Sequence, residues 1–201
     1  MFMPFLQKWE KKNSINHEIK IVNVSEDIQS GDILFLISCA EIINIRIRNK
    51  FKKTLLIHES DLPKGRGWSP LQWLIIEDQN TIPITLLEAV DKVDAGPIWK
   101  KSFIEFEGHE LINEITSKVF SEKINLMNFA IENFDSIKPQ TQPLSGISYY
   151  KKRKPEDSEI DINKSIKNQI NKIRISDENR YPCFFYFKGK KYKILLRKIN
   201  E

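Results

Sequence analysis

The segment Leu55-Leu-Ile-His-Glu-Ser-Asp-Leu-Pro-Lys-Gly-Arg-Gly-Trp-Ser-Pro70 begins as an apolar run, reaches a histidine at position 58 and continues as a polar loop with Gly and Pro. A continuously apolar run suits a parallel strand that is buried on both faces. Ligands of open parallel sheets bind at the carboxyl ends of the strands, so His58 stands where functional residues gather. A histidine at a strand end can also be purely structural.

The flanking sequence alternates between strand and helix patterns, which is typical of α/β layers. We expect strands at residues 18–24, 32–37, 54–57, 82–87 and 98–106. Helical spacing predicts helices over residues 38–51 and 108–134, and a third that begins at Trp68 with Ser69 as N-cap and Pro70 in its first turn.

Residues 138–146 carry two Pro and one Gly between apolar segments, which predicts a linker. It separates a larger domain (1–137) from a small β-rich C-terminal subdomain (147–201). In the latter, Cys183-Phe-Phe-Tyr-Phe-Lys-Gly-Lys-Lys-Tyr predicts a hairpin that turns at Lys188-Gly189.

The composition of the 201 residues, 40% hydrophobic and 29% charged, is that of a globular protein. Cys39 and Cys183 lie far apart without a Cys-x-x-Cys pair, which excludes a zinc ribbon and indicates a reducing compartment. No apolar run approaches the roughly 20 residues of a bilayer span, and no spacing suits a metal site. We therefore expect a cytoplasmic protein without a metal.

Charge is concentrated at the C-terminal end of the chain. Residues 151–201 hold 15 Lys and Arg against 7 Asp and Glu, whereas residues 1–150 hold 17 against 20. Such a basic segment suits tRNA or a nucleotide diphosphate, or is simply a solvated face.

A second candidate group lies in Val90-Asp-Lys-Val-Asp-Ala-Gly-Pro97, another loop that follows a predicted strand. A carboxylate at Asp94 is suited to orient an imidazole or to handle its proton. The other two histidines, His17 and His109, fit surface positions better than a site.

The string His58-Glu-Ser-Asp-Leu-Pro-Lys-Gly-Arg-Gly, followed by Ile84-Thr-Leu and then Asp94-Ala-Gly, resembles the folate-dependent formyltransferases. The resemblance covers about residues 18–106. Near the other end, Arg153-Lys-Pro-Glu-Asp-Ser158 and Arg180-Tyr-Pro-Cys resemble the C-terminal segment of the amino-sugar and methionyl-tRNA branches.

This resemblance implies a Rossmann-like sheet flanked by helices, with N10-formyltetrahydrofolate as formyl donor. His58 would aid proton transfer and polarise the formyl oxygen, and Asp94 would pair with it. The donor would be held by Ser38, Cys39, Ala40, Val90, Asp91, Lys92, Val93 and Asp94. The acceptor would face Ser60, Lys64, Arg66, Gly67 and Trp68. The plainer alternatives are a solvated charge for Arg66 and a core-packed staple for Trp68.

Two positions depart from the family pattern. The family's first motif carries Asn two residues before the histidine, whereas this chain has Leu56, so a backbone N–H or Ser60 would have to replace the amide. At the amino end, Met1-Phe-Met-Pro-Phe-Leu-Gln-Lys-Trp resembles the family's first helix, and the strand expected before it is missing.

The function expected from the resemblance is N-formylation of an amino sugar, linked to a nucleotide, for a surface glycan, with a homodimer as one possible assembly. The alternatives are a methionyl-tRNA formyltransferase-like enzyme, a hydrolase that uses water as acceptor, and a non-catalytic folate-fold binding module.

Overall fold

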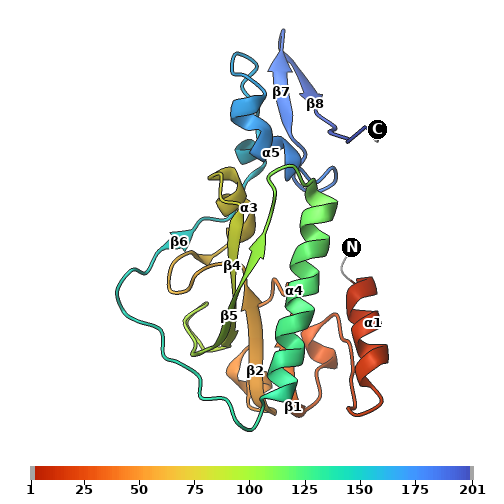
Figure 1. Cartoon of the computed structure of the whole chain (residues 1–201), viewed down its shortest axis with the longest axis vertical. Helices are drawn as coiled ribbons and strands as arrows, with labels where there is room; N and C mark the ends of the chain where they lie inside the picture. The colour runs from red at the N-terminus through yellow and green to blue at the C-terminus, as the bar shows by residue number, and fades with distance from the viewer. Residues whose placement is uncertain (1–2, 200–201) are drawn as a thin grey trace.

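The computed structural model describes residues 3–199. Its helices and strands follow one another along the chain as α1 (Met3–Asn13), β1 (Gly31–Leu36), α2 (Ile45–Arg48), β2 (Phe51–His58), β3 (Arg66–Gly67), α3 (Pro70–Ile76), β4 (Thr81–Glu88), β5 (Ile98–Glu105), α4 (Ile112–Glu132), β6 (Tyr149–Tyr150), α5 (Ile170–Arg174), β7 (Phe184–Phe187) and β8 (Lys190–Lys193) (Figure 1). Short 3-10 turns add Ser25–Asp27, Pro155–Ser158 and Lys167–Gln169.

The main sheet has four strands in the order β1-β2-β4-β5. β1 and β2 are parallel, with Leu36 opposite Leu56, as their continuous apolar runs predicted. β4 instead runs antiparallel to β2, which places Thr85 opposite His58. β4 and β5 are also antiparallel. The α/β fold class is therefore confirmed, with a mixed sheet.

Two of the expected elements are wrong. Residues 18–24 form no strand, because Ile19 and Ile21 pack against the core without joining a ladder. The helix expected over residues 38–51 is reduced to the four residues of α2. Ser38 takes a left-handed φ of +52°, and the Asn44 side chain caps the helix by accepting from the Ile47 N–H, so the helix begins late.

The predicted positions of the longer helices are confirmed. α3 starts at Pro70 after Ser69, although Ser69 has a φ of +52° and its side chain makes no cap bond. α4 lies along the sheet, and α1 packs beside α4 (Figure 1). Trp9 joins the two helices by donating from Nε1 to Asn128 at 2.8 Å. The core between sheet and helices is formed by buried apolar side chains, among them Leu55, Ile82, Ile84, Leu86, Ile115, Leu126 and Ala130.

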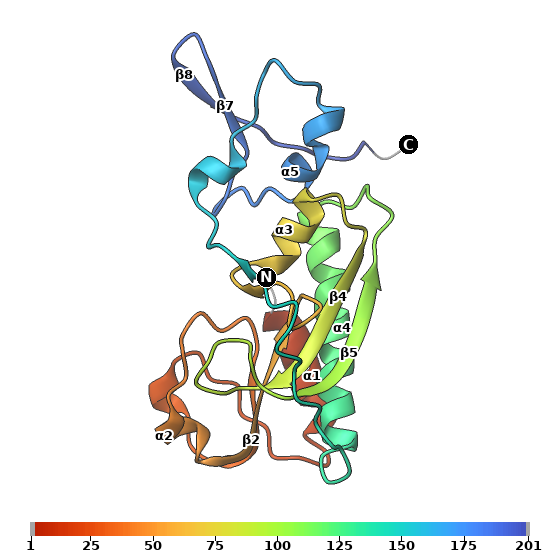
Figure 2. The same cartoon turned by 90° about the vertical axis from the view of Figure 1, so that its left-hand side faces the viewer.

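The C-terminal part holds the expected hairpin, β7–β8, with positive φ at Lys188 and Gly189 in its turn. Figure 2 shows the hairpin beyond the end of α3 and α4. A small separate core of Ile160, Ile173 and Cys183 supports it.

Arg174 of α5 ties this part to the segment before α4, because its buried guanidinium donates to the Glu110 carbonyl at 3.3 Å. The Glu110 carboxylate accepts from the N–H groups of Glu107 and Gly108 and from Lys118. Burial raises the pKa of Glu110, but these hydrogen bonds outweigh it and lower that pKa to about 2.

Candidate active site

His58 and Asp94 face each other at the carboxyl end of β2. His58 Nδ1 lies 3.7 Å from Asp94 Oδ1. Both residues are buried, with exposures of 7% and 8%. The other ring nitrogen, Nε2, lies 2.8 Å from the Gly65 carbonyl oxygen. Because a carbonyl only accepts, Nε2 carries a proton in this arrangement, and Nδ1 is the nitrogen that faces the carboxylate. The structure thus brings together the two residues that the sequence motifs pair.

Asp94 is oriented by a tight loop between β4 and β5. Its Oδ2 accepts from the Gly67 N–H at 2.9 Å, and its own backbone has a φ of +52°. The loop returns so closely that a Cβ on Gly96 would stand 1.8 Å from the Glu88 carbonyl oxygen. Only glycine fits there, so the course of the loop that carries Asp94 depends on Gly96.

Residues 58–67, named here the histidine turn, are anchored to the sheet from both sides. The buried Thr85 hydroxyl donates to the Ser60 carbonyl at 2.7 Å. Lys101 of β5 contacts Asp61 at 2.5 Å and donates to the Leu62 carbonyl at 2.7 Å. The position of His58 is therefore fixed by β4 and β5 as well as by its own strand.

Residues 140–150, named here the strap, lie over the histidine turn. Gln142 is 5% exposed and donates from Nε2 to the carbonyls of Asp94 (2.9 Å) and Gly96 (2.8 Å). Its Oε1 accepts from the Arg66 guanidinium at 2.7 Å. One amide thus joins the loop of Asp94 to the histidine turn.

Further along the strap, Ser148 Oγ accepts from the Gly65 N–H at 2.9 Å, and β6 pairs in parallel with β3. A Cβ on Gly67 would stand 2.6 Å from the Tyr150 carbonyl oxygen, so this pairing requires glycine at position 67. Most of the strap comes from the segment predicted as a linker. Sequence reasoning missed Gln142 and Ser148 because their partners lie far away along the chain.

An ion pair between a buried lysine and a mostly buried glutamate lies beside His58. Glu59 Oε1 is 2.6 Å from Lys123 Nζ of α4, and the same amine donates to Ser38 Oγ at 3.2 Å. Burial opposes the charge of Glu59, but the Lys123 ammonium outweighs burial and holds the pKa of that carboxyl below its ordinary value. Neither Glu59 nor Lys123 was singled out from the sequence.

The predicted donor residues lie on two loops, named here the donor loops: residues 38–40 after β1 and residues 90–93 after β4. Cys39 and Ala40 are exposed, as is Lys92. Val90 and Val93 expose 40% and 47% of their surface. Asp91 pairs with Arg48 of α2, which also donates to the Ala89 carbonyl at 2.9 Å. These loops therefore expose small and apolar side chains together with the charged Asp91 and Lys92.

The predicted acceptor residues do not converge on one pocket. Arg66 is 3% exposed, so it is not a solvated loop charge, and Gly67 serves as the donor to Asp94. Trp68 is 46% exposed, so it is not packed as a core staple, and the Lys152 ammonium lies 4.7 Å from its ring centroid. Ser60 is 2% exposed, and within residues 3–199 its hydroxyl has no hydrogen-bond partner.

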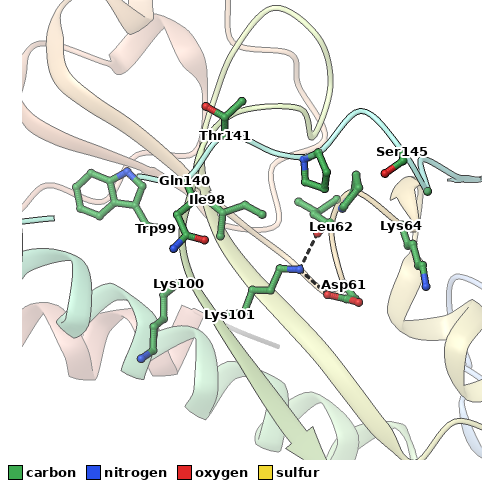
Figure 3. Close-up of a pocket in the computed structure, with 13 residues that line it drawn as sticks. Asp61, Leu62, Lys64, Ile98, Trp99, Lys100, Lys101, Gln140, Thr141 and Ser145 are labelled. Atoms are coloured by element: carbon green, nitrogen blue, oxygen red, sulfur yellow. Dashed lines mark hydrogen bonds and ion pairs between the residues drawn. The ribbon is translucent and has the colours of Figure 1, made fainter. Parts of the chain in front are cut away.

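Lys64 lines a cavity of about 600 Å³ (Figure 3). The cavity is bounded by the histidine turn, the first residues of β5 and the strap, and its lining includes neither His58 nor Asp94. In Figure 3, Lys101 reaches across to Asp61, while Lys100 points away toward α4.

Within residues 3–199, no helix is both long enough and apolar enough to cross a bilayer. In the same range, no three His, Cys, Asp or Glu side chains are grouped as a metal site would require.

The mixed α/β fold corresponds to that of formyltransferases of known structure. Methionyl-tRNA formyltransferase from Clostridium thermocellum superposes with a TM-score of 0.81 at 22% identity, covering 96% of this chain and 92% of that one. A sugar N-formyltransferase from Shewanella sp FDAARGOS_354 gives 0.71 at 14% identity, with coverages of 99% and 94%. HypX from Aquifex aeolicus, in complex with tetrahydrofolic acid, gives 0.68 at 24% identity over 80% of this chain and 28% of that one. The fold is that of the formyltransferases.

Sequence similarity points to the same group. Methionyl-tRNA formyltransferase from Rickettsia africae (strain ESF-5) is 30% identical over 178 residues, which are 88% of this chain and 58% of the relative. The chain thus spans just over half the length of that relative. No protein-family profile matches the chain. The resemblance to formyltransferases inferred from the His58 and Asp94 motifs is confirmed.

Proposed function

We propose that this chain is an N-formyltransferase that moves a formyl group from N10-formyltetrahydrofolate to the amine of an amino sugar, linked to a nucleotide, for a surface glycan. The observation that carries the proposal is the buried His58–Asp94 pair, which the histidine turn, the loop of Asp94 and the strap hold in place. A sugar N-formyltransferase and a tetrahydrofolate complex among the structures of similar fold support the choice of acceptor and donor.

The role proposed for His58 and Asp94 is the transfer of one proton. The acceptor amine forms a bond to the formyl carbon, the bond from that carbon to N10 of the donor breaks, the amine loses a proton and N10 gains one. His58 Nδ1 faces a carboxylate 3.7 Å away, which stabilises a protonated imidazole while the proton is in transit. Burial strengthens this effect because the local dielectric constant is low.

The donor loops fit a folate. Val90 and Val93 offer exposed apolar surface to a planar ring, and the neighbouring backbone of residues 38–40 and 90–93 offers hydrogen-bonding groups. The folate supplies an activated formyl group when bound. On the acceptor side we assign Lys64 and Trp68, the latter beside Lys152, to a nucleotide-linked substrate, because the phosphates and base of such a substrate suit cations and an aromatic ring. Arg66 is left out of this assignment because it is 3% exposed and bonded to Gln142.

Ser60 is our candidate for the hydrogen-bond donor that the family places at position 56. Leu56 has no polar side-chain atom, whereas the Ser60 hydroxyl is buried and unpartnered within residues 3–199. Ser60→Ala is expected to lower kcat roughly tenfold or more, because one donor to a developing oxyanion is lost. Thermal unfolding should stay nearly unchanged, since no bond within the folded chain is broken; an unchanged kcat would remove Ser60 from this role.

The proposal is tested by tetrahydrofolate release when the purified chain receives N10-formyltetrahydrofolate and a panel of nucleotide-linked amino sugars. The product is identified by mass spectrometry. One acceptor should be formylated, and His58→Ala should abolish the reaction while the protein stays folded. The exposed His17→Ala is the matched control. Absence of turnover with every acceptor would contradict the proposal and favour a non-catalytic binding module.

A methionyl-tRNA formyltransferase-like activity is the second candidate, favoured by the Rickettsia africae relative and by the basic residues of 151–201. Binding to tRNA phosphates would weaken steeply as salt rises. Formylation of methionyl-tRNA, together with a salt-dependent complex, would place this candidate first.

We also propose a cytoplasmic setting, which agrees with the free thiols of Cys39 and Cys183. Sedimentation of the purified chain would test whether it forms a homodimer.

A further inference from the structure

Lys123 carries a charge into the apolar face of α4. Its side chain is 4% exposed, and it lies among residues of that helix that are buried in the core, Val119, Leu126, Met127 and Ala130. Its ammonium contacts Glu59 at 2.6 Å, donates to Ser38 at 3.2 Å and lies 5.0 Å from the centroid of the Phe120 ring.

The stability of the fold does not by itself explain why a lysine is buried at position 123. Removing two charges from water is costly, and well-packed apolar residues often replace a buried ion pair without loss of stability. In some proteins a buried ion pair selects one arrangement of the chain, because each charge is satisfied only when its partner is in place.

Lys123 bonds to one residue in each of two loops. Ser38 lies two residues beyond the end of β1 and begins the first donor loop, with a left-handed backbone. Glu59 directly follows His58 at the end of β2. Because β1 and β2 are parallel, Ser38 and Glu59 both lie at the carboxyl ends of their strands. The Lys123 amine of α4 bonds to both.

We propose that Lys123 is a positioning residue that holds the first donor loop (residues 38–40) against the end of β2, so that a bound formyl donor is aligned with His58. This inference rests on the proposed function for the identity of the donor. The coupling between the two loops is a property of the folded chain and can be measured without any substrate.

The first test compares Lys123→Met, Lys123→Arg and the control Lys118→Met in steady-state kinetics. Lys118 also lies on α4 and pairs with a buried glutamate, Glu110, at 2.6 Å, but it is bonded to neither loop in the structure. Lys123→Met should raise the KM for N10-formyltetrahydrofolate roughly tenfold, as expected for one lost charge-assisted hydrogen bond, with a smaller change in kcat. Lys123→Arg should restore most of the affinity, and Lys118→Met should leave KM unchanged.

The second test is hydrogen exchange of the substrate-free proteins. In Lys123→Met the amides of residues 37–41 and 59–61 should both exchange faster than in the unaltered protein, whereas Lys118→Met should not accelerate these segments. If Lys123→Met does not fold, the double variant Lys123→Met/Glu59→Leu removes both charges and should show the same faster exchange.

Unchanged exchange at residues 37–41, or equal acceleration in Lys118→Met, would overturn the proposal. Faster exchange with an unchanged donor KM would also overturn it, because the loops would then be coupled without consequence for the donor. If the unaltered protein formylates no acceptor, the proposed function fails, while tetrahydrofolate binding measured by calorimetry takes the place of KM and exchange still tests the coupling.

Discussion

On the His58 side of the site, side chains from β4, β5 and the strap converge on one turn, whereas the donor loops are held at few points and face solvent. Gln142 alone makes three hydrogen bonds around Asp94 and Arg66, all from a buried position. In the second donor loop, by contrast, Asp91 leaves 89% of its side chain exposed although it pairs with Arg48. Under the proposed function, the groups that move the proton are held in place before substrate arrives, whereas the surface for a large planar donor stays open.

The largest expected effect is the loss of turnover in Asp94→Asn. The amide still accepts from the Gly67 N–H but no longer stabilises a positive charge on His58. Formyl transfer should fall roughly 10²–10³-fold with little change in donor KM. Steady-state kinetics measure this, with the exposed Asp135→Asn as control. A loss of formyl transfer of less than tenfold would mean that Asp94 and His58 do not handle the proton.

Acid unfolding gives a reference that does not involve the site. The pKa of Glu110 is lowered from 4.5 to about 2, so Glu110 stabilises the fold fully above pH 4.5, and this stabilisation is lost as the pH falls from 4.5 toward 2. At neutral pH the contribution is on the order of 3 kcal/mol. Glu110→Gln should flatten this part of the pH profile in urea unfolding, and Glu107→Gln, mostly exposed, should not. Equal profiles for Glu110→Gln and the unaltered protein would contradict the assignment.

Removing the Gln142 side chain tests how the strap holds the His58 side of the site. Gln142→Ala leaves buried groups of Arg66, Asp94 and Gly96 without their partner, which should cost about 2 kcal/mol of unfolding free energy and lower kcat. Chemical denaturation compares it with Gln140→Ala, an exposed residue whose backbone alone pairs with Ile98. If both variants lose the same stability, the strap acts through its backbone and not through the Gln142 amide.

The smallest effect is expected at the donor loops. Arg48→Ala frees the second donor loop from α2 and should destabilise the fold by about 1 kcal/mol or less, because its partner Asp91 is largely exposed. The donor KM should rise severalfold with kcat nearly unchanged. Arg46→Ala, exposed on the same short helix, is the control. A fall in kcat without a change in KM would place Arg48 with the proton-moving groups instead.

Local pattern was enough to find the strands that carry the core, the start of α3, the β7–β8 hairpin and the two motifs with His58 and Asp94. Each of these depends on the spacing of apolar residues or on turn chemistry within a few positions, which a sequence displays directly. The pairing of His58 with Asp94 was expected from the motif resemblance, and in the structure His58 Nδ1 lies 3.7 Å from Asp94 Oδ1.

Packing between distant segments decided the rest. Three features depend on which strand or core surface is available as a partner. They are the antiparallel direction of β4, the lack of strand pairing at residues 18–24 and the shortness of α2. The local sequence pattern does not contain that information. The same holds for Gln142 and Lys123, whose hydrogen-bond partners are 46 to 85 positions away in the chain. From the sequence they are one polar residue in a Pro-containing segment and one lysine in a helix. Their roles exist only because the fold buries each of them beside partners that the chain brings back from far away.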